Sequence, residues 1–152
     1  MRRNDKEITN RRIIDGILQS APVCRIALAL DSAPYIVPVN FAVKRDVLYF
    51  HCALTGRKID ILRQNTAVCF EVDLPGNLVH GETACGWGMT YQSVIGFGRA
   101  FFIENREDKV AALNVLMKKY AGRDAFTYAQ DKLDKVCVIG VKIEALSGKQ
   151  SG

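Results

Sequence analysis

The sequence of 152 residues has no apolar run long enough to cross a membrane. Its longest apolar stretches, such as residues 94–97 and 136–141, fall far short of the roughly 20 apolar residues that a membrane-spanning helix needs. The amino terminus carries charges of both signs and lacks an apolar segment followed by a small-residue cleavage site. We therefore expect neither a membrane span nor a secretory signal peptide.

Paired cysteine motifs are also missing, because the five cysteines make an odd count and contain no Cys-x-x-Cys pair. Cys24, Cys69 and Cys137 lie inside apolar runs, as small hydrophobic residues do. This usage favours a protein of the reducing cytoplasm and argues against a disulfide scaffold. Cys52 and Cys85 are candidate nucleophiles by residue type alone, since no local motif supports either.

Familiar phosphate-binding and metal-binding signatures are absent from the sequence. Residues 96–101 lack the third glycine of a dinucleotide-binding fingerprint, and no Walker motif occurs. The two histidines, His51 and His80, lie far apart in the sequence, so we do not expect a joint metal site.

The composition that is present, 49% apolar and 24% charged residues, is typical of one ordinary soluble domain, here expected to cover residues 1–152. A chain of this length can bury about 68–70% of the surface that its unfolded form exposes, so it can form a core without disulfides or structural metal. The net charge of +5 favours an anionic partner, which could be a phosphate, a nucleic acid or an acidic protein. No basic-aromatic ribbon or recognition-helix motif supports nucleic acid, so we do not expect it.

Three segments have helical patterns. Apolar residues at helical spacing predict an amphipathic helix over residues 5–19, where Asn4 and Glu7 have the spacing of a capping box. A shorter helix is predicted over residues 55–65. A third is predicted over residues 105–122, with a capping asparagine, an acidic first turn, and a glycine after its basic last turn.

Six segments with a period of two predict β-strands that are bounded by turn residues. Short connections between them favour an antiparallel sheet that closes into a small barrel, which makes the fold α+β and mainly β. Residues 74–90, which contain four glycines, are predicted to form one long irregular loop. The predicted strands are residues 24–30, 35–43, 47–53, 67–73, 91–103 and 136–145.

The stretch from Thr55 to Lys58 combines a predicted helix start with two cations. The positive end of the helix dipole disfavours cations by roughly 0.3–1 kcal/mol each, so Arg57 and Lys58 are unexpected there. A bound anion would resolve the conflict, because free N–H groups, the Thr55 hydroxyl and both side chains would converge on it. A phosphate fits this description. The alternative is a solvated basic turn in which Thr55 serves only as a helix cap.

Pro38 and Asn40 interrupt the alternation of the predicted strand over residues 35–43. One interpretation is an edge strand with a surface asparagine, since proline removes a ladder hydrogen bond. The other is a strand face that lines a ligand, where freed backbone groups and Asn40 meet the polar edge of a heterocycle. Gly96 and Gly98, on one face of a later strand, indicate a bulge or a close backbone approach.

Three stretches together closely resemble the pyridoxamine 5′-phosphate oxidase-like flavin-binding split barrels, in particular the branch named for nitroimidazole-resistance proteins. They are residues 34–41 (PYIVPVNF), residues 48–62 and residues 91–100 (YQSVIGFGRA), and the likeness extends to residues 146–149. The resemblance implies a six-stranded antiparallel split β-barrel with flanking helices. It also implies a homodimer with two FMN molecules in grooves between the subunits.

The resemblance assigns the phosphate end of the cofactor to the same basic stretch. Arg57 and Lys58 would hold the FMN phosphate, with help from Thr55 or Gly56. This agrees with the electrostatic interpretation of these residues.

The resemblance also implies contacts to the flavin ring. Val39 and Asn40 would contact the isoalloxazine edge, largely through their backbone, while His51 and Cys52 would lie beside the flavin. Ser93 of the partner subunit would make a polar contact to the cofactor.

The expected function is that of an FMN-dependent oxidoreductase that takes a hydride from a nicotinamide and reduces a small acceptor, such as a nitro compound or a quinone. The alternative is a non-catalytic module that binds flavin or haem for storage or sensing, and FAD and haem are alternatives to FMN. His51 is the candidate general acid or base by residue type, and its alternative role is to pack against the cofactor. Trp87 and Tyr91 could cover the flavin or pack at a dimer interface.

Overall fold

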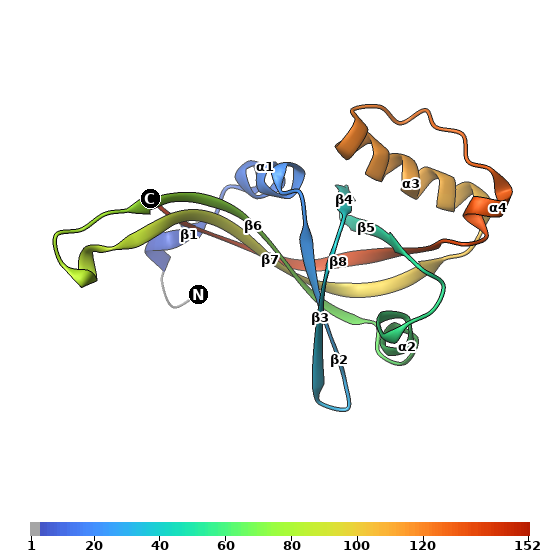
Figure 1. Ribbon diagram of the computed structural model, residues 1–152, viewed down its shortest axis with the longest axis horizontal. Helices are drawn as coiled ribbons and strands as arrows, with labels where there is room; N and C mark the ends of the chain where they lie inside the picture. Colours follow the sequence, from blue (N-terminus) through green and yellow to red (C-terminus); the bar gives the residue numbers. More distant parts are fainter. Residues whose placement is uncertain (1–3) are drawn as a thin grey trace.

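The computed structural model describes residues 4–152 as one strongly curved antiparallel sheet with helices around it (Figure 1). Its strands are β1 (Glu7–Ile8), β2 (Cys24–Leu30), β3 (Ala33–Val39), β4 (Phe41–Lys44), β5 (Val47–Cys52), β6 (Ala67–Val79), β7 (Gly88–Ile103) and β8 (Cys137–Ser151). Its helices are α1 (Arg11–Ser20), α2 (Arg57–Gln64), α3 (Arg106–Ala121) and α4 (Gln130–Leu133), with short 3₁₀ turns η1 (Asn4–Lys6) and η2 (Ala84–Gly86).

The order of the strands explains how the sheet closes. They run β3-β2-β6-β7-β8-β5-β4, and β1 pairs with β8 outside this path. The two ends of the sheet, β3 and β4, are separated in the sequence only by Asn40. The sheet therefore curls until its ends meet at one residue without pairing, which is a split barrel.

The predicted antiparallel barrel is confirmed, with eight strands in place of six. The predicted strand over residues 35–43 divides at Asn40, because β3 pairs with β2 whereas β4 pairs with β5. The other additional strand is β1. Pro38 lies in β3, which has a neighbour on one side only, as expected for a proline in an edge strand.

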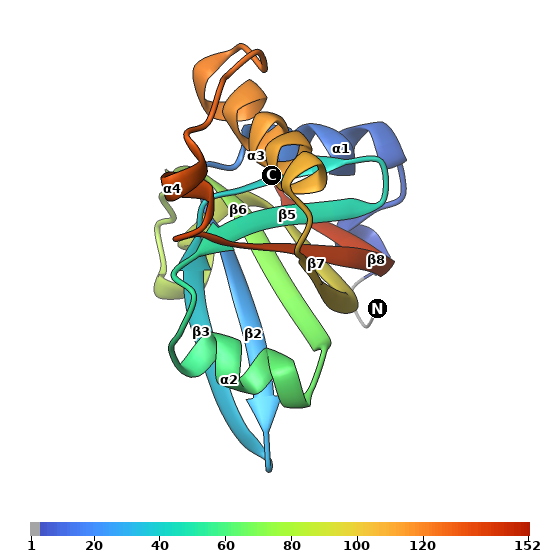
Figure 2. The same cartoon turned by 90° about the vertical axis from the view of Figure 1, so that its right-hand side faces the viewer.

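The inner face of the barrel holds the main core. Phe41, Phe50 and Phe70 are fully buried there, and apolar residues of α1 and α2 pack against the same cluster. A Cβ on Gly96 would lie 2.2 Å from the Phe70 ring, which confirms the close approach predicted at this glycine. Figure 2 shows α2 at one end of the sheet and α1 and α3 at the other.

A second, smaller core lies where α3 covers the outer face of the sheet. Ala112, Leu113 and Leu116 of α3 pack there with Ile103 and Val138. The predicted third helix is confirmed at both ends: the asparagine before it accepts a backbone hydrogen bond, and the glycine after it is left-handed with φ of 73°. Among residues 4–152, no helix is both long and apolar enough to span a membrane.

The first helix begins later than predicted. α1 starts directly after Asn10, whose side chain accepts a hydrogen bond from the backbone in its first turn. The preceding Glu7–Ile8 pair with β8 instead, where Ile8 lies opposite Gly148. Ile8 is buried, and a Cβ on Gly148 would lie 2.9 Å from the Ile8 Cβ, so this pairing needs a glycine. The predicted capping box at Asn4 is therefore wrong.

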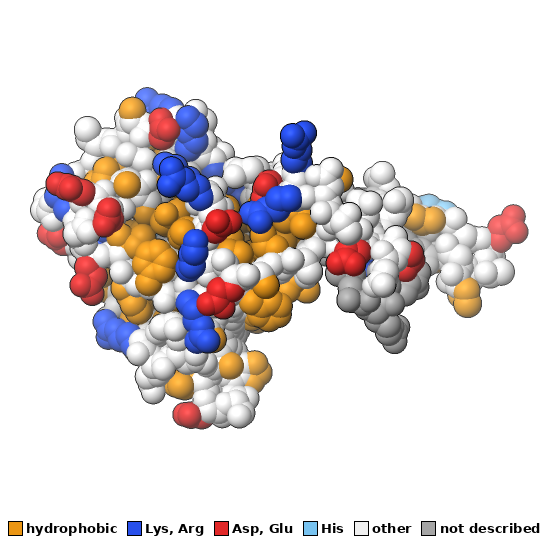
Figure 3. Space-filling view, turned by 180° about the vertical axis from the view of Figure 1, so that it is seen from behind, with side chains coloured by type: hydrophobic (Ala, Val, Ile, Leu, Met, Phe, Trp, Pro, Cys, Tyr) orange, Lys and Arg blue, Asp and Glu red, His pale blue; other side chains and the backbone are white. Residues whose placement is uncertain are grey.

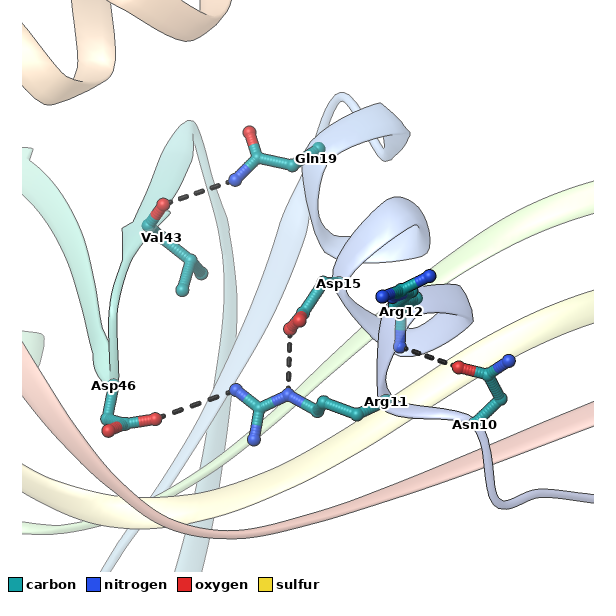
Figure 4. Close-up of polar contacts among 7 residues, drawn as sticks. All are labelled: Asn10, Arg11, Arg12, Asp15, Gln19, Val43 and Asp46. Carbon is teal, nitrogen blue, oxygen red and sulfur yellow. Dashed lines mark hydrogen bonds and ion pairs between the residues drawn. The ribbon is translucent and has the colours of Figure 1, made fainter.

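Polar contacts tie α1 to the turn between β4 and β5 (Figure 4). Arg11 donates to Asp15 at 2.8 Å and lies 3.5 Å from Asp46 in that turn. Gln19 donates to the carbonyl of Val43 at 3.2 Å. These contacts position α1 against the strand that leads into the candidate site.

The predicted loop over residues 74–90 is instead the outer part of a long β-hairpin, which we call the arm. β6 and β7 remain paired up to a tip at residues 80–87, with a register shift beside Gly76. A Cβ on Gly76 would collide with Thr90, and the Thr90 hydroxyl accepts a hydrogen bond from the backbone N–H of Asn77 at 2.7 Å. The glycines that suggested a loop therefore permit close strand pairing. The arm projects away from the body of the molecule (Figure 1).

Candidate functional site

The carboxyl end of β5 places two predicted site residues on opposite faces of the sheet. His51 is exposed and lies opposite Val138 of β8, whereas Cys52 is half-buried against the main core and lies opposite Cys137. This alternation follows from the two-residue period of the strand.

The connection from β5 to α2 ends in Gly56, which is the residue before the first helical turn. Its φ of 123° and ψ of 166° lie in a region that only glycine adopts without strain. No side chain caps the helix, so the prediction that Thr55 is the cap is wrong. The first backbone N–H groups of α2 have no partners within the helix and remain available to a ligand.

The two cations of the first turn reach toward two different strands. The Arg57 guanidinium lies 5.1 Å from the ring centre of Tyr35 on β3. The Lys58 ammonium lies 5.7 Å from the ring centre of Phe50 on β5. The start of α2 therefore lies between β3, at one end of the sheet, and β5, next to the other end.

These cations have no acidic counterpart. Within the described part of the chain, neither Arg57 nor Lys58 forms an ion pair with a carboxylate. Both lie at the positive end of the helix dipole, which adds to their mutual repulsion. The cluster is therefore complementary to an anion with several acceptor oxygens, such as a phosphate.

Val39 and Asn40 lie at the junction of β3 and β4, four and five residues after Tyr35, the residue that Arg57 approaches. Val39 is buried and opposite Cys24, while Asn40 is exposed and unpaired in the sheet. Since Phe41 is opposite Phe50, Asn40 falls one position further along, at the level of His51. Sheet closure thus brings the predicted contacts Val39, Asn40, His51, Cys52, Gly56, Arg57 and Lys58 to one end of the barrel.

Burial and the nearby ammonium set the ionisation of the two side chains at the end of β5. Partial desolvation lowers the pKa of His51, and the charge of Lys58 lowers it further. Burial raises the pKa of the Cys52 thiol, against the opposing influence of Lys58. At neutral pH, His51 is therefore a neutral imidazole that can accept or donate a hydrogen bond.

Ser93 is not part of this cluster within one chain. It lies in the arm half of β7, opposite Asp73 and Lys149. His51 of β5 lies opposite Val138 of β8, and Val138 lies opposite Ile103 of β7 on its other side. Ile103 is ten residues further along β7 than Ser93. At about 3.3 Å per residue, Ser93 lies roughly 33 Å along the strand from that position. Its predicted role as a contact from a partner subunit stays a prediction.

Trp87 lies in the arm, and Tyr91 directly follows the arm in β7, away from α2. Trp87 is half-exposed, and its ring lies 4.5 Å from that of His80. Two surface cavities, of about 550 and 690 Å³, lie beside α3 and are lined by neither Arg57 nor Lys58.

Three site features escaped prediction from the sequence. Tyr35 lies under Arg57, Phe50 lies under Lys58, and Cys137 is the cross-strand neighbour of Cys52. The alternation of residues around Tyr35 and Phe50 assigned both to strands, but only the three-dimensional closure shows which helix they meet. No local signal links Cys52 to Cys137, because their strands are far apart in the sequence.

Comparison with protein families gives one match over most of the chain. The model of the pyridoxamine 5′-phosphate oxidase family matches residues 10–150. Among curated proteins, an uncharacterized protein of Rhizobium meliloti is 31% identical over 65 residues. That alignment covers 43% of this chain and 42% of the relative, so the chain spans less than half of that protein's length.

Solved structures match the whole fold. A Bacteroides thetaiotaomicron protein proposed to confer 5-nitroimidazole resistance is 32% identical, with a TM-score of 0.85 over 95% of this chain and 86% of that chain. An FAD and haem binding protein of Mycobacterium smegmatis has a TM-score of 0.88 at 22% identity, over 96% and 73% of the two chains. A flavocytochrome of Azotobacter vinelandii has a TM-score of 0.86 at 20% identity, over 100% and 72%. The last two likenesses concern the fold alone.

Proposed function

This chain belongs to the pyridoxamine 5′-phosphate oxidase family, and we propose that it binds FMN and uses it to reduce a small acceptor in the cytoplasm. The observation that carries the proposal is a pair of cations, Arg57 and Lys58, at a helix start that no side chain caps; neither forms an ion pair with a carboxylate among residues 4–152. A phosphate monoester offers oxygens to both side chains and to the free N–H groups at once.

The neighbouring residues suit the rest of the cofactor. Asn40 and the backbone of Val39 beside it offer polar groups to the edge of a flavin ring, at the level of the exposed His51. When bound, FMN would supply the redox chemistry, accepting a hydride from a nicotinamide and passing electrons to a nitro compound or quinone. The Bacteroides protein, at 32% identity, supports a nitro compound as one class of acceptor.

In this proposal, His51 holds the flavin ring and is not a proton donor. Its pKa is lowered, which keeps it neutral near pH 7, and its exposed ring at the end of β5 suits hydrogen bonding to a heterocycle. Positioning of the donor and acceptor then accounts for most of what the protein contributes.

The phosphate interpretation is tested by comparing FMN with riboflavin, which lacks the phosphate. We expect FMN to bind much more tightly. Replacing Arg57 by alanine should weaken FMN binding by about 1.5–3 kcal/mol, or roughly 10- to 150-fold, because a charge-assisted hydrogen bond is lost. Riboflavin affinity should not change. Fluorescence quenching of each flavin on titration with protein gives both constants.

The matched control is Arg63→Ala, which removes the same charge from the other end of α2. It should leave FMN affinity within about twofold of the parent protein, since an exposed charge away from the phosphate is largely screened by salt. Equal affinities for FMN and riboflavin would refute the phosphate cluster.

We further propose that the cofactor site is shared in a homodimer. β7 exposes every second residue on the outer face of the sheet, and Ile95, Phe97 and Phe101 of this row are 41%, 53% and 42% exposed. Figure 3 shows apolar side chains over the body of the molecule on both sides of a band of charged ones. A row of this kind suits an isologous contact with a second copy.

The register of the sheet indicates what such a contact would do for Ser93. If two β7 strands pack face to face in opposite directions about Phe97, Ser93 of one chain lies over Phe101 of the other. Phe101 is opposite Gly140 of β8, which is in turn opposite Tyr49, two residues before His51. Ser93 is thereby carried from the arm to the neighbourhood of the partner's flavin site.

The dimer is tested with Phe97→Asp, which would place two like charges at the two-fold axis. Since like charges across an interface cost several kcal/mol, the dimer dissociation constant should rise more than about 100-fold. Sedimentation equilibrium at fixed protomer concentrations measures it. Ile13→Asp is the control and should leave the dimer intact, because Ile13 is an exposed apolar residue of α1, which packs against the opposite, inner face of the sheet. A dimer unaffected by Phe97→Asp would contradict this interface.

A second candidate function is a binding module that holds flavin or haem for storage or sensing. The fold can hold FAD together with haem, as in the Mycobacterium smegmatis protein, so it is compatible with such a module. The two functions are distinguished by identifying the chromophore released from purified protein and by adding NADH or NADPH with a nitro or quinone acceptor. Repeated reduction and reoxidation supports the reductase, whereas a chromophore that stays oxidised with both nucleotides supports the module.

A further inference from the structure

Cys52 and Cys137 are the two cysteines that the sheet places directly opposite each other. Cys52 is the last residue of β5, Cys137 is the first residue of β8, and the register pairs them across the antiparallel ladder. Both side chains are half-buried, and both are free thiols.

Cross-strand geometry allows these thiols to form a disulfide without moving either strand. Directly opposite residues in an antiparallel pair have Cα atoms about 4.5 or 5.5 Å apart. Disulfides in proteins span Cα separations of about 4.4–6.8 Å. Only the side-chain torsions need to change, and the pair lies at the end of the β5–β8 ladder, where the connection to α2 begins.

The two thiols are not equivalent. Burial is the main cause that raises the pKa of both thiols. The neighbouring Cys52 sulfur adds to the shift at Cys137, whose pKa reaches about 11 although Lys109 and Arg63 oppose the shift. The charge of Lys58 opposes the shift at Cys52. Cys52 also ends β5 directly before the connection to α2, which carries the Lys58 ammonium, so Cys52 is the better placed nucleophile.

We propose that Cys52 and Cys137 form a thiol–disulfide exchange site whose oxidising substrate is a low-molecular-weight disulfide. The Cys52 thiolate attacks one sulfur of the substrate, which forms a mixed disulfide and releases one thiolate of the substrate. Cys137 then gives up its proton and attacks the Cys52 sulfur, forming the internal disulfide and releasing the second thiolate. Two protein thiols are oxidised, and one substrate disulfide is reduced to two thiols.

The remaining cysteines lack these features. Cys24 is fully buried, and burial raises its pKa to about 12. Cys69 lies opposite Ala27 and Phe97, and Cys85 is exposed in the tip of the arm. A transient exchange disulfide is also the kind that a reducing compartment permits.

The test uses the full chain without added flavin, so its outcome does not depend on FMN binding. The protein is incubated with oxidised glutathione, free thiols are blocked by alkylation, and intact protein and peptides are weighed by mass spectrometry. We expect an internal Cys52–Cys137 disulfide, with the loss of two hydrogen atoms from the chain and no glutathione retained on either residue.

Two variants test the assigned roles. Cys137→Ser should stop at the mixed disulfide and retain one glutathione on Cys52, because the resolving thiol is missing. Cys52→Ser should lose the internal disulfide and leave Cys137 largely unmodified. Cys85→Ser is the control and should form the internal disulfide as the parent does.

The proposal is overturned if Cys52 and Cys137 are both still fully alkylated under conditions that attach glutathione to the exposed Cys85. It is also overturned if Cys137→Ser retains no glutathione on Cys52.

Discussion

Replacing Gly56 by alanine isolates the backbone conformation on which the start of α2 depends. A Cβ at this position would meet nothing within 4 Å, so packing gives no reason for the substitution to be harmful. The backbone does, because φ of 123° with ψ of 166° is a conformation that costs a residue with a side chain about 1–3 kcal/mol. The free energy of unfolding should fall by that amount.

Gly16→Ala is the matched control, since Gly16 in α1 also has nothing within 4 Å of its added Cβ and has no positive φ. Inside a helix the same change should raise the free energy of unfolding by about 0.5–1 kcal/mol. The two variants therefore move in opposite directions although they add the same atom to equally open space.

Urea unfolding at one fixed protomer concentration measures both, since a dimer makes stability depend on concentration. In thermal unfolding, Gly56→Ala should lower the midpoint by about 2–12 °C, taking 2–4 °C for each kcal/mol at this chain length. FMN affinity should fall as well, because the first N–H groups of α2 shift when the strain is relieved. If Gly56→Ala and Gly16→Ala shift the stability in the same direction by similar amounts, the conformational reasoning is wrong.

Two further predictions concern the framework and the pH dependence. The Tyr120 hydroxyl accepts a hydrogen bond from the buried backbone N–H of Phe41 at 2.9 Å. Tyr120→Phe leaves that donor unsatisfied and should lower the free energy of unfolding, measured in urea, by about 1–3 kcal/mol. The control is Tyr128→Phe, which should lower it less, because the Tyr128 hydroxyl donates only to the side chain of Asn114. The pKa of His51 is lowered on folding, so the unfolded chain binds more protons between the folded value and 6.5, and stability should fall as the pH drops through that window. His51→Gln should flatten this slope in unfolding curves recorded from pH 5 to 7, and an unchanged slope would contradict the assignment.

Local signals predicted those elements whose ends are fixed locally. The third helix matched at both ends because Asn105 and Gly122 satisfy its terminal groups from within the same segment. The strand over residues 24–30 also matched, since its alternating pattern and flanking turns lie within a few residues of it. In these places the sequence near an element contains the physical cause of its boundaries.

Elements whose ends depend on distant partners were predicted less well. Ile8 has the spacing of a helical residue, but its burial against Gly148 makes it part of a strand. Gly76 belongs to a glycine-rich segment that predicts a loop, but in the structure its missing side chain lets Thr90 pack closely in a hairpin. In both cases, the structural role of a glycine depends on a contact with a residue elsewhere in the sequence, and a local pattern does not reveal that contact.

The candidate site was predicted where two local preferences conflict. Cations at a helix start are unfavourable whatever the fold, so the positions of Arg57 and Lys58 in the sequence are enough to indicate an anion. The cap at Thr55 was wrong for a related reason: a side-chain cap would occupy the N–H groups that the anion needs, and Gly56 leaves them free. The pairing of Cys52 with Cys137 creates no conflict in either segment, because each cysteine is acceptable as a small apolar residue in its own strand. The proposed reaction between these two thiols can be inferred only from the structure, in which the sheet pairs β5 with β8.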